Sequence, residues 1–472
     1  MTDTARATIF ALASGAGRAG VAVLRVSGPE ARTALEALAG PAPKPRRASL
    51  RRLTDPRTGE ALDDALTLWF PAPNSFTGED CAELHVHGGQ AVIGAVADAL
   101  RALPGVRLAE PGEFTRRAFE NGKLDLTQAE GLADLIDAET EGQRRQALRQ
   151  MEGALGALYA DWRAHLLRAM ALIEAEIDFP DEDVPGGISA QAMPILRAVE
   201  MAMRAHLADS ARGERVRDGY RIAILGAPNA GKSSLLNALA GREAAIVSDI
   251  PGTTRDVVEI RLALGGFPVW IADTAGLREA ADAIEAEGVR RALARAEEAD
   301  LRLVLIDGEE APEAALRLMR DGDLLIRTKA DLHGWIPGSR SARPGMTEGR
   351  SDGAPSQVMP AERSESRDPA LAAVWVSAKT GEGVTGLLEQ ITARVAQALS
   401  EQGAPALTRA RHRGLVEQAA DALARAQVAM DEGPELAGED VRLSARALGR
   451  LTGTIDVEDI LGEIFSSFCI GK

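Results

Sequence analysis

The residues best suited to chemistry lie in one segment, Gly226-Ala227-Pro228-Asn229-Ala230-Gly231-Lys232-Ser233-Ser234. An apolar run that predicts a strand, Arg221 to Leu225, precedes it, and an apolar stretch that predicts a helix follows it. Strand, glycine loop and helix in that order are the context that a P-loop requires. In such a loop, backbone N–H groups surround a β-phosphate, Lys232 would bridge the β- and γ-phosphates, and Ser233 would bind Mg²⁺. The segment therefore predicts a nucleoside triphosphate site.

Two later segments are predicted to complete this site. Ser248 and the polar loop Asp249-Ile250-Pro251-Gly252-Thr253-Thr254-Arg255-Asp256 follow Lys232, and Thr254 is the expected hydroxyl ligand of Mg²⁺. The second segment, Asp273-Thr274-Ala275-Gly276, ends a predicted strand. It would place a carboxylate near the metal and a glycine N–H near the γ-phosphate. Together the two segments predict switches that respond to the nucleotide.

Base recognition is predicted at Thr328-Lys329-Ala330-Asp331 and at Ser377-Ala378-Lys379, each of which follows an apolar run. Asp331 can accept from both the N1–H and the 2-amino group of guanine, a pair of donors that adenine lacks. The nucleotide is therefore predicted to be GTP. GTPases usually have Asn where Thr328 stands. Because a hydroxyl cannot make all the contacts of an amide, we expect this change to affect guanine affinity and the bracing of the P-loop.

The attacking water needs a group to orient it. Small GTPases that use a side chain for this purpose have Gln at the position of Leu277. Glu285, in the acidic segment that follows, is a candidate that could act through a bridging water, and the alternative is a solvated helix start with acidic residues near its N-terminus. The sequence shows no evident arginine finger, so a monovalent cation is an alternative source of positive charge.

The elements around these motifs predict several domains. Short strand-like runs with helical pieces, from Thr8 to about Phe119, predict a small α+β domain. Helices follow, with an apolar stripe at steps of three and four. A strand–loop–helix alternation from Tyr220 to about Leu399 predicts a Ras-like, doubly wound sheet. Helices then resume to the end. The expected domains, in a multi-domain α/β chain, are 1–122, 123–213, 214–401 and 402–472.

The last stretch is expected to pack with the first helical stretch, so that the α/β domain is inserted into one helical domain. The alternative is two separate helical domains, but a piece of about 70 residues would make a marginal core alone. Within the α/β domain, a stretch rich in Gly, Ser, Pro and Arg at 333–369 is expected to be a disordered surface insertion.

Composition excludes several classes of protein. The chain has 472 residues, a formal net charge of −16 and 45% apolar residues. Disorder throughout is excluded. A general nucleic-acid binder that works by counterion release is not expected, since a negative field repels phosphate backbones, and any RNA contact would be local or come from a partner. The two cysteines, Cys81 and Cys469, lie far apart, which excludes a disulfide scaffold and favours a reducing compartment. With no run long enough to cross a membrane, a cytoplasmic protein is expected.

Two further patterns resemble functional motifs but are not expected to be functional sites. Gly15-Ala16-Gly17-Arg18-Ala19-Gly20 matches a dinucleotide-binding pattern but leads into a predicted strand, so a simple loop is expected. His85 and His87 would share one face of a strand, but with no third ligand nearby a structural or surface role is expected.

Taken together, these motifs resemble the MnmE (TrmE/ThdF) family of tRNA modification GTPases. Further segments of the chain carry the same resemblance: Pro73 to Asp80, Pro111 to Phe114, Lys123 to Leu126, Ile177 to Glu182 and the tail Cys469-Ile470-Gly471-Lys472. The match spans nearly the whole chain, and the tail is its most specific part.

The resemblance implies ligands for several residues. It places K⁺ at Asn229, Ser248, Ile250 and Thr253, Mg²⁺ at Ser233 and Thr254, and a water-orienting role at Glu285. It implies a tetrahydrofolate one-carbon donor bound by Arg25, Glu83, Lys123 and Lys472. Cys469 would lie near that pocket as a candidate catalytic residue, although the sequence by itself shows only a thiol in the tail.

The resemblance also implies partners. The family forms homodimers through its N-terminal domains, and its GTPase domains meet across potassium ions when GTP is bound. It acts with the flavoprotein MnmG, in a heterotetramer, to add a carboxymethylaminomethyl-type group at C5 of the wobble uridine, position 34, of certain tRNAs. Most tRNA contact would then come from the partner. Two rival interpretations are a regulatory GTP switch whose N-terminal domain does no chemistry and a ribosome-assembly GTPase. The folate-like N-terminal domain and the tail argue against the second.

Overall fold

The structure is a computed structural model. It describes residues 7–471 except 16, 179–187, 228, 242–258, 274–295, 308–316, 318, 333–373, 401–404, 431–432, 456–457 and 467. The chain forms two compact units. The first comprises residues up to 138, 145–210 and 404 onwards, and the second comprises 139–144 and 211–403.

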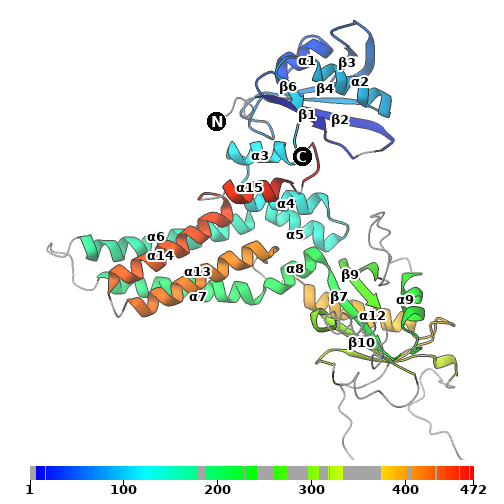
Figure 1. The fold of residues 1–472 in the computed structure, drawn as a ribbon, viewed down its shortest axis with the longest axis vertical. Helices are drawn as coiled ribbons and strands as arrows, with labels where there is room; N and C mark the ends of the chain where they lie inside the picture. Colours follow the sequence, from blue (N-terminus) through cyan, green and yellow to red (C-terminus); the bar gives the residue numbers. More distant parts are fainter. Residues whose placement is uncertain are drawn as a thin grey trace, which may run out of the picture. The chain divides into compact units, whose positions relative to one another are not determined.

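The first unit begins with a six-stranded sheet, shown in blue in Figure 1. Its strand order is β3-β4-β5-β2-β1-β6, and all neighbours are antiparallel except β1 and β6. Helices α1 and α2 share one apolar core with the sheet, which includes Leu24, Leu38 and Leu100. This part is the predicted α+β fold. Its elements are β1 (Thr8–Leu12), β2 (Ala19–Ser27), α1 (Ala31–Ala39), β3 (Ser49–Thr54), β4 (Ala61–Phe70), β5 (Cys81–Gly88), α2 (Gln90–Arg101) and β6 (Val106–Leu108).

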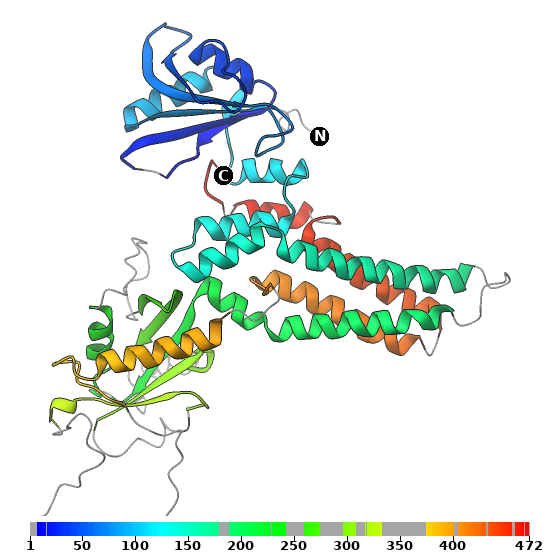
Figure 2. The same cartoon turned by 180° about the vertical axis from the view of Figure 1, so that it is seen from behind.

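Helices make up the rest of the first unit. Long helices α6, α7, α13 and α14 run alongside one another in both views (Figures 1 and 2). They share one core, to which Tyr159 and Leu196 contribute from the first stretch and Leu423 and Leu448 from the last. Two stretches far apart in the sequence therefore pack as one helical body, as predicted. The helices of this unit are α3 (Glu113–Glu120), α4 (Leu126–Ile136), α5 (Glu141–Met151, mostly in this unit), α6 (Ala154–Asp178), η2 (Ile188–Gln191), α7 (Ala192–Ala208), α13 (Ala410–Ala429), α14 (Pro434–Thr452) and α15 (Glu458–Ser466).

Local sequence sets two of these boundaries. Asp125 caps α4, because its carboxylate accepts from the backbone N–H of Gln128 while the Gln128 side chain accepts from the backbone N–H of Asp125. The expected apolar stripe is interrupted, since α5 ends at Met151 and α6 begins at Ala154. Gly153 between them has φ +91°, a left-handed conformation that ends a helix and that glycine adopts without strain. The stripe therefore belongs to two helices.

An ion cluster lies buried between the two helical stretches. Glu130 of α4 accepts from Nε2 of His412 at 2.6 Å and from Nη2 of Arg411 at 2.9 Å, both on α13. Nη2 of Arg409 donates to Asp134 at 2.7 Å. Burial alone would raise the pKa of Glu130, but His412, Arg411 and Arg409 outweigh it and hold the pKa below its usual value. The cluster ties residues about 280 positions apart in the chain.

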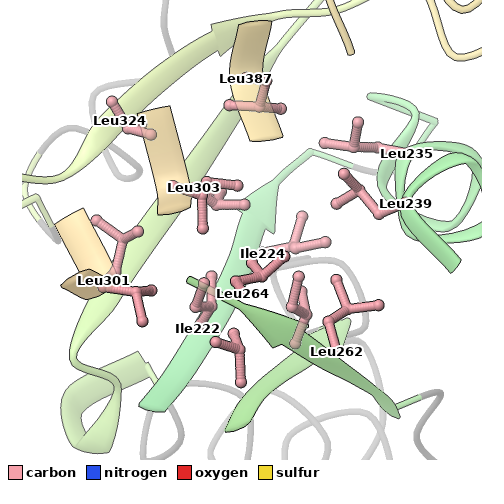
Figure 3. Close-up of a cluster of buried hydrophobic side chains, with 14 of the residues drawn as sticks. Ile222, Ile224, Leu235, Leu239, Leu262, Leu264, Leu301, Leu303, Leu324 and Leu387 are labelled. Carbon is pink, nitrogen blue, oxygen red and sulfur yellow. The ribbon is translucent and has the colours of Figure 1, made fainter. Parts of the chain in front are cut away.

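The second unit is a doubly wound sheet in the order β12-β11-β10-β7-β9-β8, parallel except for β8. Figure 3 shows its core, in which Ile222 and Ile224 of β7 meet Leu235 and Leu239 of α9, and Leu387 of α12 lies over the sheet. The predicted Ras-like α/β fold is confirmed. The elements are α8 (Ser210–Asp218), β7 (Tyr220–Gly226), α9 (Lys232–Ala240), β8 (Glu259–Leu264), β9 (Phe267–Asp273), β10 (Leu301–Ile306), β11 (Leu324–Arg327), η3 (Ala330–Leu332), β12 (Val374–Trp375) and α12 (Val384–Leu399). Of all the helices in the described ranges, none is long and apolar enough to cross a membrane.

Candidate functional site

Strand β7 positions the phosphate loop at the centre of the sheet. It is buried except at Arg221, as expected for a strand that is covered on both faces. Its parallel neighbours are β10 on one side and β9 on the other, so the chain reverses its direction of winding beside β7. Ligands of open α/β sheets bind at the carboxyl ends of the strands at such a switch point. The predicted P-loop begins there.

The P-loop backbone has the conformation expected of an anion cradle. Asn229 has φ +63° and Gly231 has φ +90°, both in the left-handed region. Asn tolerates this region better than most side chains and Gly adopts it freely. Left-handed residues in such a turn point successive N–H groups into one concavity, and helix α9 starts at the next residue, Lys232. The loop is therefore shaped to receive a phosphate.

Lys232 is held inside this loop. Its Nζ donates to the carbonyl oxygens of Gly226 at 3.1 Å and Ala227 at 3.0 Å. Burial lowers the pKa of Lys232, and the nearby carboxylate of Asp273 opposes that effect. The ammonium therefore lies inside the loop, bonded to carbonyls that a phosphate could replace, and its contact with the phosphates stays a prediction.

The side chains of Ser233 and Asp273 meet at the start of α9. Oγ of Ser233 donates to Oδ2 of Asp273 at 2.8 Å. Oδ1 of Asp273 is buried and has no hydrogen-bond partner among the described residues. A buried carboxylate oxygen without a partner is costly, and hydroxyl and carboxylate oxygens are the ligands that Mg²⁺ prefers. The chemistry of the two residues therefore fits a magnesium ion, and the assignment of the metal to this site stays a prediction.

The two base-recognition segments are bound to each other. Oγ of Ser377 donates to Oδ1 of Asp331 at 2.7 Å, and the backbone N–H of Ala330 donates to the carbonyl of Val376. The carboxylate of Asp331 is thus oriented while the residue stays exposed. Lys329 has φ +56° and its Nζ pairs with Asp307. Asp307 was not among the predicted residues, because it lies in another loop and matches no motif.

Thr328 reaches the P-loop in spite of its short side chain. Its Oγ1 lies 2.8 Å from the carbonyl oxygen of Ala230 and the residue is buried. One brace of the P-loop is therefore present, and the effect of Thr328 on guanine affinity stays a prediction.

The N-terminal sheet holds a second set of predicted residues. Arg25 of β2 and Glu83 of β5 are cross-strand partners, and their side chains form an ion pair at 3.0 Å. The guanidinium of Arg25 lies over two aromatic rings, 5.3 Å from the centroid of Phe76 and 5.9 Å from that of Phe114. A cation, a carboxylate and aromatic faces suit a flat heterocycle with donors and acceptors, such as the pterin of a folate. Sequence reasoning did not assign the two rings, since only the fold brings them to Arg25.

The tail and Lys123 are also placed on this part of the first unit. Ile470 forms an antiparallel bridge with Pro111, and Gly471 packs so closely on the carbonyl of Leu12 that an added Cβ would lie 2.1 Å from it. The residue next to Leu12 is Ala11, the β-sheet partner of Arg25. Cys469 is a free, exposed thiol. The stem of Lys123 packs beside Gly78, in the loop that carries Phe76.

The two patterns that only resemble functional motifs have ordinary surroundings. The glycine pattern at 15–20 leads into β2, as the sequence analysis expected. His85 lies 3.1 Å from Glu83, and His87 lies 2.8 Å from Asp63.

Several predicted residues lie outside the described part of the chain. These are Ser248, Asp249, Ile250, Pro251, Gly252, Thr253, Thr254, Thr274, Ala275, Gly276, Glu285 and Lys472, together with the insertion at 333–369.

Comparisons with known proteins agree with this architecture. The family model described as "MnmE helical domain" matches residues 126–469, and that described as "GTP-binding protein TrmE N-terminus" matches residues 8–123. A relative from Parvibaculum lavamentivorans, named tRNA modification GTPase MnmE, is 57% identical over 98% of this chain and 100% of its own length. One of the same name from Phenylobacterium zucineum is 56% identical over 98% of this chain and 99% of its own.

One solved structure is similar to a part of this chain. The G domain of the FeoB iron transporter of T. maritima is 24% identical and covers 38% of this chain and 99% of its own, with a TM-score of 0.25. That score is too low to support any argument about function.

A doubly wound sheet with a P-loop at its switch point, followed by a base-recognition aspartate, defines the class of the P-loop GTPases. By the family models and the full-length relatives, the chain belongs to the family of the tRNA modification GTPase MnmE. It is therefore a GTP hydrolase that acts in tRNA modification.

Proposed function

We propose that this chain is a potassium-activated GTPase that, with the flavoprotein MnmG, adds a carboxymethylaminomethyl group to C5 of the wobble uridine, position 34, of certain tRNAs. A tetrahydrofolate derivative would supply one carbon. The observation that carries the proposal is the coexistence in one chain of two arrangements: the Ser233–Asp273 pair beside the P-loop, and the Arg25–Glu83 pair, whose guanidinium lies over two aromatic rings. Full-length relatives named for tRNA modification support it.

In the hydrolytic step, the oxygen of a water attacks the γ-phosphorus of GTP, and the bond from that phosphorus to the bridging oxygen of the β-phosphate breaks. Lys232 would leave the carbonyls of Gly226 and Ala227 and hold the β- and γ-phosphates. Ser233 and Asp273, with Thr254, would hold Mg²⁺, which neutralises charge on the phosphate oxygens when bound. Glu285 would orient the water through a second water.

The potassium site is proposed at Asn229, Ser248, Ile250 and Thr253, of which the structure describes Asn229. When bound, potassium would supply the positive charge that an arginine finger gives in other GTPases. The side-chain amide oxygen of Asn229 is a suitable hard ligand, and its residue lies at the mouth of the P-loop.

Guanine would be selected by Asp331, which Ser377 orients. Thr328, Lys329, Ala378 and Lys379 would line the rest of the base site. The remaining nucleotide contacts are proposed at the P-loop residues Asn229, Ala230, Gly231 and Ser234 and at the switch residues Asp249, Pro251, Gly252, Thr274, Ala275 and Gly276.

The folate site is proposed at Arg25, Glu83, Lys123 and Lys472, with Cys469 as a candidate catalytic thiol. The tail that carries Cys469 packs beside Pro111 and beside Leu12, and Leu12 is on β1, the strand that pairs with the strand of Arg25. This placement supports a common site, because the tail packs on β1 and Arg25 is on β2, the neighbouring strand.

The proposed organisation follows the chain. Residues 1–122 would bind folate and dimerise, 123–213 and 402–472 would form the helical domain, and 214–401 would form the GTPase domain. The partner would supply most of the tRNA surface, because this chain has a net charge of −16. The proposed setting is the cytoplasm, where such a complex would meet its tRNA.

The proposal is tested by complementation. In a bacterium that lacks its own copy of this gene, the wild-type chain is expected to restore the modified wobble nucleoside, measured by mass spectrometry of digested tRNA. Lys232→Ala is expected to abolish the modification, because the phosphates lose their cation. Lys44→Ala, at an exposed lysine of the first unit, is the matched control. Unmodified tRNA with the wild-type chain, or full modification with Lys232→Ala, would contradict the proposal.

A further inference from the structure

Thr328 occupies a buried position between the phosphate loop and the base-recognition segment. It follows the end of β11 and is 5% exposed. Its side chain lies beside Gly231, since a Cβ added there would be 3.6 Å from Cβ of Thr328. Thr328 therefore contacts the loop that receives the phosphates and also begins the segment that ends in Asp331.

The hydroxyl of Thr328 lies within hydrogen-bond distance of two backbone carbonyl oxygens. Oγ1 lies 2.8 Å from the carbonyl oxygen of Ala230 and 3.1 Å from that of Ile306. The backbone N–H of Thr328 also donates to Ile306, at 3.0 Å. A hydroxyl has a single proton to donate. Since both neighbours are acceptors, that proton is used within the protein.

A guanine base presents N7 as an acceptor, and a residue that reads it must donate. An amide has two N–H donors and could brace the loop with one group and bind the base with another, whereas Thr328 has no proton left. The opposite edge of guanine has two donors, which suit the exposed carboxylate of Asp331 that Ser377 holds.

We propose that the hydroxyl of Thr328 serves only to position the P-loop, through the carbonyl of Ala230, and that this enzyme selects guanine through Asp331 without a side-chain donor from Thr328 to N7. The proposal rests on the guanine site proposed above. It implies an unusual specificity, since a nucleotide in which N7 is replaced by a C–H group should bind as well as GTP.

The test compares GTP with 7-deaza-GTP in competition against a fluorescent GTP analogue, with the full chain, Mg²⁺ and K⁺. The wild-type chain is expected to bind both within about twofold. Thr328→Asn is expected to favour GTP over 7-deaza-GTP by about 2- to 10-fold, the range of one added hydrogen bond. A wild-type preference for GTP of about fivefold or more that is lost in Thr328→Val would overturn the proposal, because it would show a hydroxyl contact with N7.

The positioning role has its own readout. Thr328→Val is expected to weaken binding of both nucleotides by the same factor, since it removes the brace but no base contact, and Thr328→Ser is expected to restore both. Thr392→Val is the matched control, because its hydroxyl bonds only to Leu388 within its own helix α12. If Thr328→Val binds both nucleotides like the wild type, the brace has no role and the proposal fails.

A final variant separates this proposal from the guanine site itself. Asp331→Asn is expected to change the nucleotide preference from GTP to xanthosine triphosphate, because the amide can donate a hydrogen bond to the base where the carboxylate only accepts. If it does not, the guanine site is misplaced and both proposals fall. If it does, and the wild type prefers GTP to 7-deaza-GTP in a way that Thr328→Val loses, only the inference about Thr328 is wrong.

Discussion

Oγ of Ser233 lies 2.8 Å from Oδ2 of Asp273, although 40 positions separate the two residues in the chain. Ser233 is the second residue of helix α9 and Asp273 ends strand β9, so the contact joins the phosphate loop to the start of the second predicted switch. The other carboxylate oxygen of Asp273 is buried without a hydrogen-bond partner among the described residues. This geometry supports the proposal that the pair holds Mg²⁺.

Ser233→Ala is expected to weaken GTP binding in the presence of Mg²⁺ by about tenfold or more, because a hydroxyl ligand is lost from a site that Mg²⁺ binds in near-ideal octahedral geometry. In EDTA, wild type and variant should bind alike. Fluorescence titration with a labelled GTP analogue measures both conditions. Ser400→Ala, at an exposed serine after α12, is the control. Equal Mg²⁺ dependence in Ser233→Ala and wild type would remove Ser233 from the metal site.

Glu130→Gln is expected to destabilise the helical body by about 3 kcal/mol at neutral pH, because Arg411 and His412 lose the carboxylate that they contact. Urea unfolding followed by far-ultraviolet circular dichroism measures the change. Glu36→Gln, which breaks an exposed pair with Arg32, should leave the unfolding curve unchanged. A Glu130→Gln curve that overlays the wild type would show that the cluster contributes nothing.

The same carboxylate predicts a dependence on pH. Because the pKa of Glu130 is lower in the folded chain than its ordinary value of 4.5, its contribution to stability is complete above 4.5. It is lost as the pH falls below that value towards the pKa of the folded state. Between neutral pH and pH 4.5 the free energy of unfolding of the wild type should therefore exceed that of Glu130→Gln by a constant amount. This difference should become smaller in stronger acid. If the difference in free energy of unfolding instead increased on acidification, it would contradict a lowered pKa of Glu130 in the folded chain.

Arg25→Ala is expected to abolish measurable binding of a tetrahydrofolate derivative, since it removes the cation that pairs with Glu83 and lies over Phe76 and Phe114. Isothermal titration calorimetry measures the affinity. Arg32→Ala, on the exposed face of α1, is the matched control and should bind like the wild type. GTP turnover without tRNA should be unaffected in both variants. Undiminished folate binding by Arg25→Ala would place the site elsewhere.

Residues that act through local sequence context were predictable. The P-loop was evident because an apolar strand, a glycine turn and a helix must follow one another for Lys232 to face a phosphate. Asp273 was evident because it ends an apolar run, and the carboxyl ends of parallel strands form one edge. The two helical stretches were expected to pack together because the last one, of about 70 residues, would make a marginal core alone.

Contacts that depend on distant pairing were not predictable. Nothing in the sequence links Glu130 to His412, and only the folded helices bring them within 2.6 Å. The brace from Thr328 to Ala230 was missed because the position was compared with its usual amide, whereas the carbonyl of Ala230 is close enough for a shorter side chain. The rings of Phe76 and Phe114 reach Arg25 from a loop and from helix α3, which no periodicity reveals.

The central claim is a GTPase whose hydrolysis depends on potassium bound at Asn229. The most direct measurement is GTP turnover by the full chain in K⁺ and in Na⁺, for the wild type and for Asn229→Gly, a variant that keeps the left-handed backbone but removes the side chain. Wild-type turnover is expected to be about tenfold or more faster in K⁺, as for other groups that stabilise transition-state charge, and Asn229→Gly is expected to be slow in both. Equal turnover of the wild type in the two salts would contradict the account.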